Sequence, residues 1–566
     1  MQADSLKTQA EAERSRSQLV VPKRGDILDR NGTVLATSVE RYNLFVDQAI
    51  VKGYIHYGYL DRDGREVAEK TAVKAGLPEQ VLGTGAAQAA RRLAPLLETS
   101  AAELGGQMVG DQRFVYLRKK ITPQLWNKIK AMDIDGIGAE RVYVREYPND
   151  ATAASVIGFV DNDMEGQSGI EATQNKVLSG SAGEVRSEIS PTGQVIPGSQ
   201  KIVKEARDGN DVQLTLDADL QSIAEDALND GVKRSGGEWG AVVVENVSTG
   251  ELLVLADSGN QNPDKMRNAS GGTSGSRAVQ YSFEPGSVGK LVTFATALDK
   301  GTITPLSTYR LPTRYTTGNG ESFKDFHDHG NALMTATGVL MVSSNIGTIQ
   351  IGDTVKDQDR WLMMRKLGLG QVTGIEMPGE TAGQIFKADQ WDARQRYTTM
   401  FGQGISVSVL QLGSLAAALG NSGVRMPLKL VGGIENKGSI VTVKDKRSPV
   451  TAVDSDTAAT MVRMMQSVTA QEWFEPHIKL DGYHFANKTG TAEIIAKNGQ
   501  LVGTISTLVG LVPAEDPVLS MAVVIYKPNT GDVVAPEILR AIAKPAMSIL
   551  QVPPITEPPQ LYPNEP

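Results

Sequence analysis

The chain is organised around the stretch Phe283-Glu284-Pro285-Gly286-Ser287-Val288-Gly289-Lys290 and the apolar run 291–298 that follows it. The Pro-Gly pair favours a break in the chain, and the residues from 287 to about 299 have the composition of a helix. The apolar run leaves this helix hardly any polar face, so we expect the helix to be buried. Ser287 would then lie in its first turn, with Lys290 on the same face.

Ser287 and Lys290 form a candidate acyl-transfer pair. A serine hydroxyl is a weak nucleophile at neutral pH and needs a base within hydrogen-bond reach, and lysine can be that base only after losing its proton. Burial disfavours the charged form of lysine, so an apolar helix would supply the neutral amine. A chain of this length contains roughly one or two Ser-x-x-Lys matches by chance, so the motif needs support from elsewhere.

Length and composition limit the classes of protein that fit. The 566 residues exceed what one hydrophobic core usually supports, so we expect two or more domains. The net charge of -8 and the lack of a long basic run argue against a nucleic-acid binder. The chain has no cysteine, which excludes thiol catalysis, cysteine-ligated zinc and disulfides. Neither a long apolar stretch nor a signal peptide is visible, so the sequence as given is expected to be soluble.

Four segments are expected along the chain: a stalk at 1–23, an N-terminal module at 24–209, a larger domain at 210–552 and a Pro-rich tail at 553–566. Residues 1 to about 19 have few apolar positions and predict a polar helix. The module combines strands and helices, without obvious chemistry. The larger domain has strands at both ends and helices between them, which predicts an antiparallel sheet covered by helices. The tail is expected to be extended or disordered.

Two hairpins are predicted in the larger domain. The first joins β-rich runs at 240–247 and 251–256 through the turn Ser248-Thr249-Gly250. The second joins runs at 507–512 and 519–526 through a turn that contains two prolines. These hairpins would supply strands of the predicted sheet.

Two further motifs strengthen the prediction that Ser287 is catalytic. Ser343-Ser344-Asn345 follows an apolar run at a predicted helix end, where a hydroxyl and an amide can point into a cleft. Lys488-Thr489-Gly490-Thr491 falls on a predicted strand, where lysine and hydroxyls can hold an anion and glycine permits close approach of a substrate. Ser258-Gly259-Asn260 also fits Ser-x-Asn, but it precedes Ser287 and is assigned to a loop. Each motif alone is weak, whereas the order Ser-x-x-Lys, Ser-x-Asn, Lys-Thr-Gly is specific.

With this order of motifs, the chain resembles the penicillin-binding proteins and serine β-lactamases. The stretch Arg24 to Gly32 is similar to the opening signature of the pedestal in class B penicillin-binding proteins. Other matching positions are Arg145, Tyr147, Gly158, Gly169, Glu171, Leu367-Gly368-Leu369-Gly370, Pro378-Gly379-Glu380 and Gly402-Gln403-Gly404-Ile405-Ser406. The stretches Phe283 to Ser287 and Ser343 to Thr348 most resemble the division-specific, FtsI-like branch.

The resemblance implies an α+β chain, in which an extended pedestal that does not bind penicillin precedes a transpeptidase domain of serine β-lactamase-like fold. It implies a peptidoglycan D,D-transpeptidase that cross-links stem peptides ending in D-Ala-D-Ala during septal wall synthesis and is a β-lactam target. It implies no cofactor, no metal and no nucleic acid, but a membrane glycosyltransferase and divisome proteins as partners. The family normally has one N-terminal membrane helix, so we expect a single-pass N-terminal anchor that leads into a juxtamembrane stalk at 1–23, and an enzyme on the extracytoplasmic face of the cell membrane.

The resemblance also implies a role for each catalytic residue. Ser287 would attack the penultimate D-Ala carbonyl while Lys290 takes its proton. Ser343, in contact with Lys488, would pass the proton to the leaving amine, and Asn345 would hold the substrate backbone. β-Lactams would acylate the same serine.

The Lys-Thr-Gly strand is implied to bind substrate. Thr489 and Thr491 would bind the terminal carboxylate beside Gly490, and the backbone N–H groups of Ser287 and Thr491 would form the oxyanion hole. The sequence departs from the family at Asn487 and Glu493, where glycine and glutamine are more usual. Neither change removes a catalytic atom, but both can alter the strand edge.

Several alternatives stay open. An elongation-type class B transpeptidase, a D,D-carboxypeptidase, and a non-enzymatic β-lactam receptor or division scaffold would keep the same motifs. A serine β-lactamase is disfavoured because the large N-terminal module would be surplus to such an enzyme. The stretch Asp325-Phe326-His327-Asp328-His329 is the best zinc candidate, but it has no evident further ligand and is interpreted as a polar loop at the rim of the cleft. The methionines at 461–465 are assigned to core packing.

Overall fold

The chain divides into two units in the computed structural model, which describes residues 15–188, 196, 198–268, 275–495, 500–530 and 533–566. Unit 1 contains the described residues of 1–25, 37–146 and 179–209, and unit 2 contains 26–36, 147–178 and 210–566. The segments 26–36 and 147–178 therefore pack with unit 2, although they lie inside the predicted N-terminal module. The domain boundaries given above stay a prediction.

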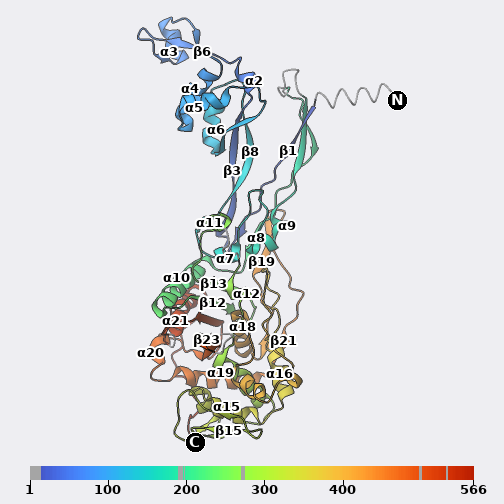
Figure 1. Cartoon of the computed structure of the whole chain (residues 1–566), viewed down its shortest axis with the longest axis vertical. Helices are drawn as coiled ribbons and strands as arrows, with labels where there is room; N and C mark the ends of the chain where they lie inside the picture. The colour runs from blue at the N-terminus through green and yellow to red at the C-terminus, as the bar shows by residue number, and fades with distance from the viewer. Residues whose placement is uncertain (1–14, 189–195, 197, 269–274, 496–499, 531–532) are drawn as a thin grey trace, which may run out of the picture. The chain divides into compact units, whose positions relative to one another are not determined.

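Unit 1 combines strands and helices (Figure 1). β3 (Val34–Val46), whose first residues belong to unit 2, pairs in antiparallel fashion with β7 (Val115–Ile121) and β8 (Ile137–Glu146). Helices α4 (Gly85–Leu97) and α5 (Ala101–Met108) contribute to a separate hydrophobic core with β3. The remaining elements are α2 (Gln48–Val51), β4 (Ile55–Leu60), β5 (Glu66–Val67), α3 (Glu69–Ala75), β6 (Gln80–Thr84), α6 (Pro123–Lys130), β9 (Gly183–Glu188) and β10 (Lys201–Lys204).

The first described residues correct the prediction of a polar helix over residues 1 to about 19. Residues 1–14 lie outside the described residues, whereas β1 (Ser15–Val20) is a strand that pairs with β9. The pairing partner lies far away in the sequence, so its hydrogen bonds decide the conformation in a way that local composition does not reveal.

Unit 2 contains a five-stranded antiparallel sheet in the order β13-β12-β24-β23-β22. The strands are β12 (Trp239–Asn246), β13 (Leu252–Asp257), β22 (Ala486–Ile495), β23 (Leu501–Val512) and β24 (Leu519–Tyr526). The pairs β12–β13 and β23–β24 confirm both predicted hairpins. Nearly every residue of β12, β13 and β24 is buried, which requires a layer on each face of the sheet.

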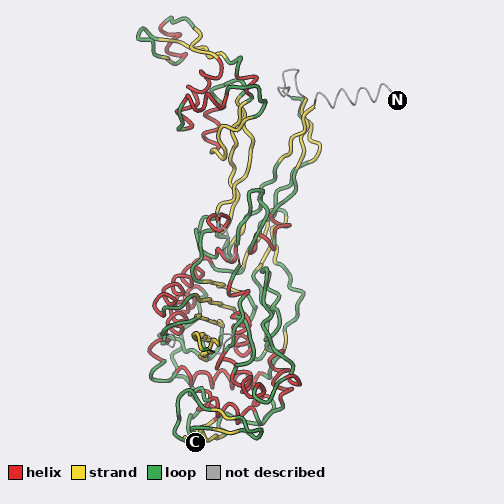
Figure 2. Tube along the Cα trace, in the orientation of Figure 1, coloured by secondary structure: helices red, strands yellow, loops and turns green. Residues whose placement is uncertain are grey.

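Helices cover both faces of this sheet, as predicted (Figures 1 and 2). α10 (Ala218–Ser235), α20 (Glu475–Ile478) and α21 (Val534–Ile549) pack on one face, around the core that contains Val242 and Val523. α18 (Val409–Gly420) and α19 (Ser455–Thr469) lie over the other face, around the core that contains Val243. The methionines of α19, at 461, 464 and 465, are buried in this second core, so their assignment to core packing is confirmed.

The other elements of unit 2 surround this layered core. They are β2 (Ile27–Leu28), α7 (Ala154–Ile157), α8 (Gly169–Thr173), α9 (Asn175–Leu178), β11 (Val212–Leu214), α11 (Pro263–Asn268), α12 (Arg277–Gln280), η1 (Gly286–Gly289), α13 (Lys290–Asp299), β14 (Thr308–Leu311), β15 (Tyr315–Thr316), β16 (Ser322–Phe323), β17 (Ala332–Thr335), α14 (Ala336–Met341), α15 (Asn345–Gly352), α16 (Asp357–Lys366), η2 (Ala388–Gln390), α17 (Gln395–Thr398), η3 (Thr399–Phe401), β18 (Val424–Arg425), β19 (Val431–Asn436), β20 (Ser439–Thr442) and β21 (Val450–Thr451). Within the described ranges, no helix is both long and apolar enough to cross a membrane.

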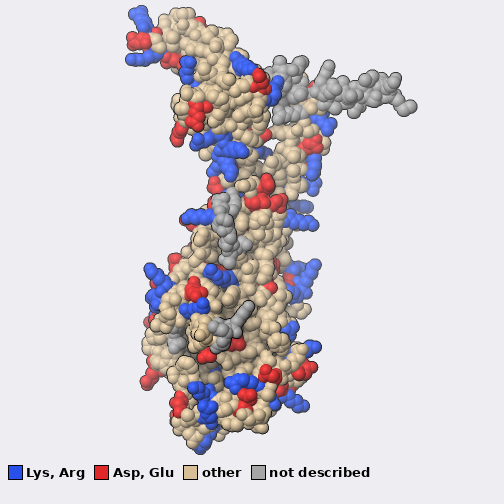
Figure 3. Space-filling model, in the orientation of Figure 1, with Lys and Arg blue, Asp and Glu red and all other residues tan. Residues whose placement is uncertain are grey.

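The surface carries side chains of both charges, as expected from the similar numbers of basic and acidic residues in the chain. On the face in Figure 3, Lys and Arg side chains are interspersed with Asp and Glu side chains over the described residues.

The Pro-rich tail is extended, as one of the two predicted alternatives states, and it packs on unit 2. Thr335 donates hydrogen bonds to the tail through its backbone N–H and its hydroxyl, 3.0 Å from Asn564 O and 2.7 Å from Pro563 O. Arg463 Nε donates to Gln560 O at 2.6 Å, and the Arg463 guanidinium lies over the Tyr562 ring. The tail therefore contacts the residue that caps α14, the helix before Ser343.

Candidate active site

Ser287 lies in a short 3-10 turn that leads directly into a buried helix. The turn η1 is followed at once by α13, so the predicted helix start is confirmed. Gly286 has a φ of 57°, and a Cβ at this position would lie 2.6 Å from Thr491 O. Glycine therefore permits both the turn and its close contact with the edge strand β22.

The Lys290 side chain is fully buried, and the three oxygen atoms nearest to its amine lie within 2.9 Å. Its Nζ lies 2.7 Å from Ser287 Oγ, 2.7 Å from Asn345 Oδ1 and 2.9 Å from Ser343 O. An ammonium has three N–H donors, whereas a neutral amine has two and one lone pair. The Asn345 amide oxygen and the Ser343 backbone carbonyl oxygen can only accept hydrogen bonds, so they would accept from the two N–H donors of a neutral amine. The lone pair is then free to accept the Ser287 hydroxyl proton.

Ser343 occupies the turn between α14 and α15, which confirms the predicted helix end. Its φ of 58° lies in the left-handed region, which is uncommon for residues other than glycine and is found at functional sites. Ser343 Oγ lies 2.9 Å from Lys488 Nζ and 3.3 Å from Lys290 Nζ. One hydroxyl therefore connects the two lysine amines.

The edge strand β22 supplies the third motif. Lys488 is fully buried, and its Nζ also donates to Thr489 O at 2.9 Å. Thr489 is half-buried and Thr491 is exposed, and as alternate residues of a strand they share one face. Two hydroxyls thus line up along an accessible strand face next to the lysine.

The packing of the chain itself requires glycine at position 490, apart from the predicted close approach of a substrate. A Cβ at this position would lie 2.3 Å from Thr507 Oγ1 and 2.5 Å from Pro285 O. Because real Cβ atoms are not found this close to other atoms, any other residue would push β22 away from η1. Gly490 therefore lets the edge strand pack directly against the turn that carries Ser287.

Burial changes the protonation of both lysines. Desolvation, followed by the positive charge of Lys488, lowers the pKa of Lys290 well below its ordinary value of 10.5, while the Asp325 carboxylate acts in the opposite direction. Desolvation also lowers the pKa of Lys488 from 10.5 to about 7. Both side chains can therefore exchange protons with a reacting group without extreme pH.

The structure brings the three predicted motifs to one place. Ser287, Lys290, Ser343, Asn345 and Lys488 are joined by the hydrogen bonds described above. The predicted substrate residues Thr489, Gly490 and Thr491 follow Lys488 on β22, and Gly490 packs on η1. Their roles in catalysis and binding stay predictions.

Asp325, which the sequence indicates only as part of a possible zinc loop, also belongs to this site. Its carboxylate accepts hydrogen bonds from the Ser344 hydroxyl and from the Ile346 N–H, at 2.6 and 2.9 Å. No spacing rule connects these positions, because the contact depends on how the segment before β17 folds back on α15. His329 Nε2 lies 3.7 Å from Asp325 Oδ2, and within the described part of the chain no group of three or more metal-ligating side chains is found.

The two departures from the family pattern lie on β22. Asn487 is buried, and its Nδ2 donates to Thr469 Oγ1 at 2.5 Å, which ties β22 to the C-terminal end of α19. Glu493 is exposed, on the same strand face as Thr489 and Thr491. Asn487 is therefore buried and holds β22 on α19, whereas Glu493 adds a negative charge to the accessible face of the strand.

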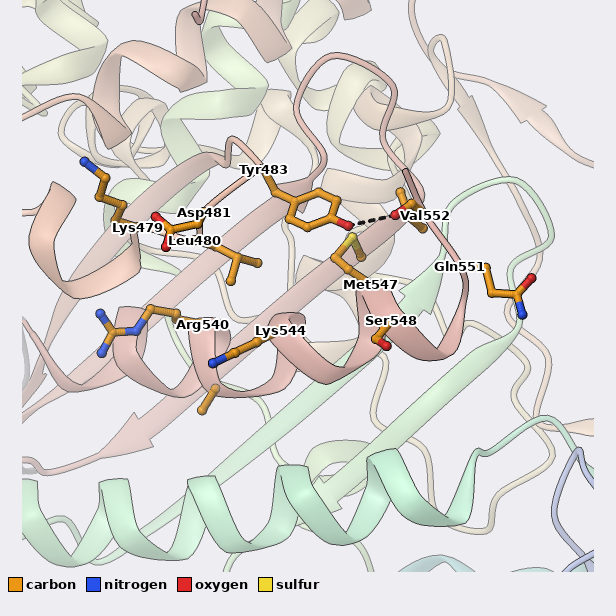
Figure 4. A pocket seen from close by; sticks show the side chains of 11 residues that line it. Lys479, Leu480, Asp481, Tyr483, Arg540, Lys544, Met547, Ser548, Gln551 and Val552 are labelled. Atoms are coloured by element: carbon orange, nitrogen blue, oxygen red, sulfur yellow. Dashed lines mark hydrogen bonds between the residues drawn. The ribbon is translucent and has the colours of Figure 1, made fainter. Parts of the chain in front are cut away.

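A separate pocket of about 810 Å³ lies beside α21 (Figure 4). Its walls come from the segment 479–483 and from α21 and the residues after it. Arg540 and Lys544 line it, and the Tyr483 hydroxyl donates to Val552 O at 2.7 Å. None of the eight predicted site residues lines this pocket, so it is distinct from the candidate active site.

Comparison with known proteins gives similarity over almost the whole chain. Two family models match: "Penicillin binding protein transpeptidase domain" over residues 240–544 and "Penicillin-binding Protein dimerisation domain" over residues 19–214. The chain is 30% identical to penicillin-binding protein PbpB of Mycolicibacterium smegmatis, over 91% of this chain and 80% of that protein. It is 30% identical to peptidoglycan D,D-transpeptidase FtsI of Escherichia coli K12, over 83% of this chain and 79% of that protein. A crystal structure of a peptidoglycan synthetase from Bifidobacterium adolescentis has a TM-score of 0.76 and 33% identity, and covers 98% of this chain and 100% of that one.

Proposed function

Because this chain belongs to the class B penicillin-binding proteins, we propose that it transfers the acyl group of a peptidoglycan stem peptide to an amine through an acyl-enzyme at Ser287. The chain is a serine-type peptidoglycan D,D-transpeptidase of the FtsI and PbpB type and a target of β-lactams. The observation that carries the role of Ser287 is its 2.7 Å contact with the buried Lys290 amine, whose nearest other contacts are carbonyl oxygens.

In the acylation step, Ser287 Oγ attacks the carbonyl carbon of the penultimate D-Ala, and its proton passes to Lys290 Nζ. The backbone N–H groups of Ser287 and Thr491 stabilise the oxyanion that forms. Donors of this kind are typically worth about 3 to 4 kcal/mol each in barrier height. The close packing of Gly286 and Gly490 between η1 and β22 supports this pairing of two N–H groups from separate segments.

In the next step, the bond to the terminal D-Ala nitrogen breaks, and that nitrogen must gain a proton. Ser343 Oγ lies between the two lysine amines, so it passes the proton held by Lys290 to the leaving nitrogen. The Asn345 Oδ1 atom contacts Lys290, which leaves its amide nitrogen for the substrate backbone. An amine of a neighbouring stem then attacks the ester, its proton returns through Lys290, and Ser287 is regenerated.

The terminal carboxylate of the donor peptide is bound at the accessible face of β22. Thr489 and Thr491 present hydroxyl donors there, and Lys488 adds positive charge when protonated. This placement orients the scissile carbonyl towards Ser287, since the carboxylate and the carbonyl belong to adjacent residues of the substrate.

The test of the function combines a covalent label with product analysis. After incubation with a fluorescent penicillin, we expect one adduct on the peptide that contains Ser287, released slowly. With a D-Ala-D-Ala stem peptide and an amine acceptor, we expect more cross-linked than hydrolysed product. Rapid release would indicate a β-lactamase, predominant hydrolysis a carboxypeptidase, and no label a scaffold, and each of these results would contradict the proposal.

The pH dependence of acylation follows from the two buried lysines. Lys290 must be neutral to act as base, and its lowered pKa places the acid limb of the rate profile far below pH 10. Lys488 loses its charge as pH rises through about 7, which weakens the binding of an anionic donor. We therefore expect a bell-shaped profile of the second-order acylation rate, with a basic limb near pH 7. A basic limb that does not move to higher pH in Lys488→Arg, whose guanidinium stays charged, would contradict this assignment.

The biological setting is proposed from the same resemblance. The stretches around Ser287 and Ser343 favour the division-specific branch over the elongation-type branch, with a membrane glycosyltransferase and divisome proteins as partners. Peptidoglycan lies outside the cytoplasmic membrane, so the enzyme works on the extracytoplasmic face. A fluorescent fusion of the full-length protein should concentrate at the septum, whereas an even distribution along the cell wall would favour the elongation branch.

A further inference from the structure

Asp325 lies in the segment between β16 and β17, and its side chain is only 5% exposed. Both of its carboxylate oxygens are used at the start of α15. Oδ2 accepts from the Ser344 hydroxyl at 2.6 Å, and Oδ1 accepts from the Ile346 N–H at 2.9 Å. The Ser344 hydroxyl also accepts from the Gly347 N–H at 2.9 Å, as the cap of α15. The carboxylate thus satisfies a free N–H of the first helical turn and faces its positive end.

These contacts involve the immediate chain neighbours of Ser343 and Asn345, which the proposed mechanism uses. Asn345, whose Oδ1 lies 2.7 Å from Lys290 Nζ, stands between Ser344 and Ile346 in the chain. Ser343 precedes them in a left-handed conformation with a φ of 58°. Such a conformation persists only where the surroundings hold it, and it sets the direction of the Ser343 hydroxyl. Hydrogen bonds that fix Ser344 and Ile346 therefore also fix the Ser343 hydroxyl, which the proposed mechanism uses to transfer the proton.

We propose that Asp325 is a positioning residue for acylation, because its hydrogen bonds to Ser344 and Ile346 hold the turn that presents Ser343 and Asn345 to Lys290. This inference rests on the proposed function and adds to it a residue outside the three motifs. Asp325 touches neither Ser287 nor the amines in a hydrogen bond, so it acts through the turn and through its charge.

The charge of Asp325 has a separate consequence. Burial and the nearby Lys488 lower the pKa of Lys290, whereas the Asp325 carboxylate raises it. The titratable groups that face this arrangement are Lys290 on α13, Lys488 on β22 and His329 on the same loop as Asp325. Asp325 thus keeps the amine more basic than burial alone would leave it, and a stronger base removes the serine proton more effectively.

Two substitutions separate the hydrogen bonds from the charge. In Asp325→Asn, the amide oxygen can accept from the Ile346 N–H while its NH₂ donates to the Ser344 hydroxyl, so both contacts of the turn are kept, the one to Ser344 with its direction reversed, and the charge is lost. We expect a maximal acylation rate about threefold to tenfold lower, with the acid limb of the pH profile displaced to lower pH. In Asp325→Ala both bonds are lost, and we expect a decrease of about 10²-fold, because small displacements of catalytic groups have effects of this size.

The matched control is Asp328→Asn, which removes an exposed acid of the same loop and should acylate as the wild type. The measurement is the second-order rate of acylation by a chromogenic β-lactam between pH 5 and 10, together with thermal midpoints. An Asp325→Ala variant with the wild-type rate would overturn the positioning role, and an Asp325→Asn variant with an unmoved acid limb would overturn the electrostatic one. If the wild type itself is not acylated at Ser287, the proposed function fails instead, so the two failures are distinguishable.

Discussion

The variant Ser287→Ala is expected to form no covalent adduct with a β-lactam, and its acylation rate should fall by about 10⁴-fold or more. The substitution removes the only atom that can form the ester in the proposed mechanism. It leaves the backbone N–H, the buried Lys290 and the packing of η1 on β22 in place. Intact-mass spectrometry after incubation with a penicillin measures this directly, since the wild type gains the mass of the antibiotic and the variant does not.

Loss of labelling must be separated from loss of the fold. Ser287 is half-buried and donates to no backbone group that holds the turn, so we expect the free energy of unfolding to change by no more than about 1 kcal/mol. Ser439→Ala, at an exposed position of β20, removes a hydroxyl elsewhere in unit 2 and should label as the wild type. An adduct that survives in folded Ser287→Ala would show that another residue is the nucleophile.

Local features of the sequence predict the local part of the site. The Pro-Gly break and the apolar run place Ser287 and Lys290 on consecutive turns of η1 and α13, and their side chains meet because residues three apart face each other. The apolar character of α13 also predicts that Lys290 is buried, and burial is the main cause of its lowered pKa. Residue type and spacing are sufficient for these conclusions, because every contact involved lies within a few residues.

The convergence of the motifs is different, because it depends on contacts between distant segments. The 2.9 Å contact of Ser343 Oγ with Lys488 requires the turn before α15 to meet the edge strand β22. Only the order of motifs, through the family resemblance, indicates that they meet. The role of Asp325 has no such signal, since its partners are reached only when the segment before β17 folds back on α15.

The errors have the same origin. Residues 15–20 look helical by composition but form β1, because β9 offers a complete ladder of backbone partners. Gly490 looks like a place for a substrate, but the atoms that exclude a side chain there are Thr507 Oγ1 and Pro285 O of the chain itself. In both cases the deciding atoms come from a segment that is remote in sequence, so a local pattern cannot identify them.

The two buried lysines have different roles in the proposed reaction. Lys290 contacts the serine that gives up a proton, whereas Lys488 contacts the hydroxyl that delivers one and lies next to the hydroxyls proposed to hold the substrate carboxylate. A positive charge on one lowers the proton affinity of the other, which favours a neutral Lys290 while Lys488 is charged. This is the protonation state that nucleophilic attack on an anionic donor requires.

A second large effect is therefore expected at Lys290. Lys290→Arg should lower the acylation rate by about 10³-fold, because a guanidinium keeps its proton and cannot act as the base. Lys290→Met should have an effect of similar size, because it keeps an unbranched side chain but has no amine. Stopped-flow acylation with a chromogenic β-lactam measures both rates, and the loss should not be recovered at any pH between 5 and 10.

Stability distinguishes this prediction from misfolding. Lys290→Met leaves Ser343 O and Asn345 Oδ1 without their donor, so we expect the free energy of unfolding to fall by about 1 to 3 kcal/mol, which leaves the variant folded at 25 °C. Lys300→Met, at an exposed lysine just after α13, is the matched control and should acylate normally. Acylation within about tenfold of the wild type in folded Lys290→Met would assign the base to another group, since general bases contribute 10²-fold or more. Lys488 is the next candidate, because the Ser343 hydroxyl already connects it to the site.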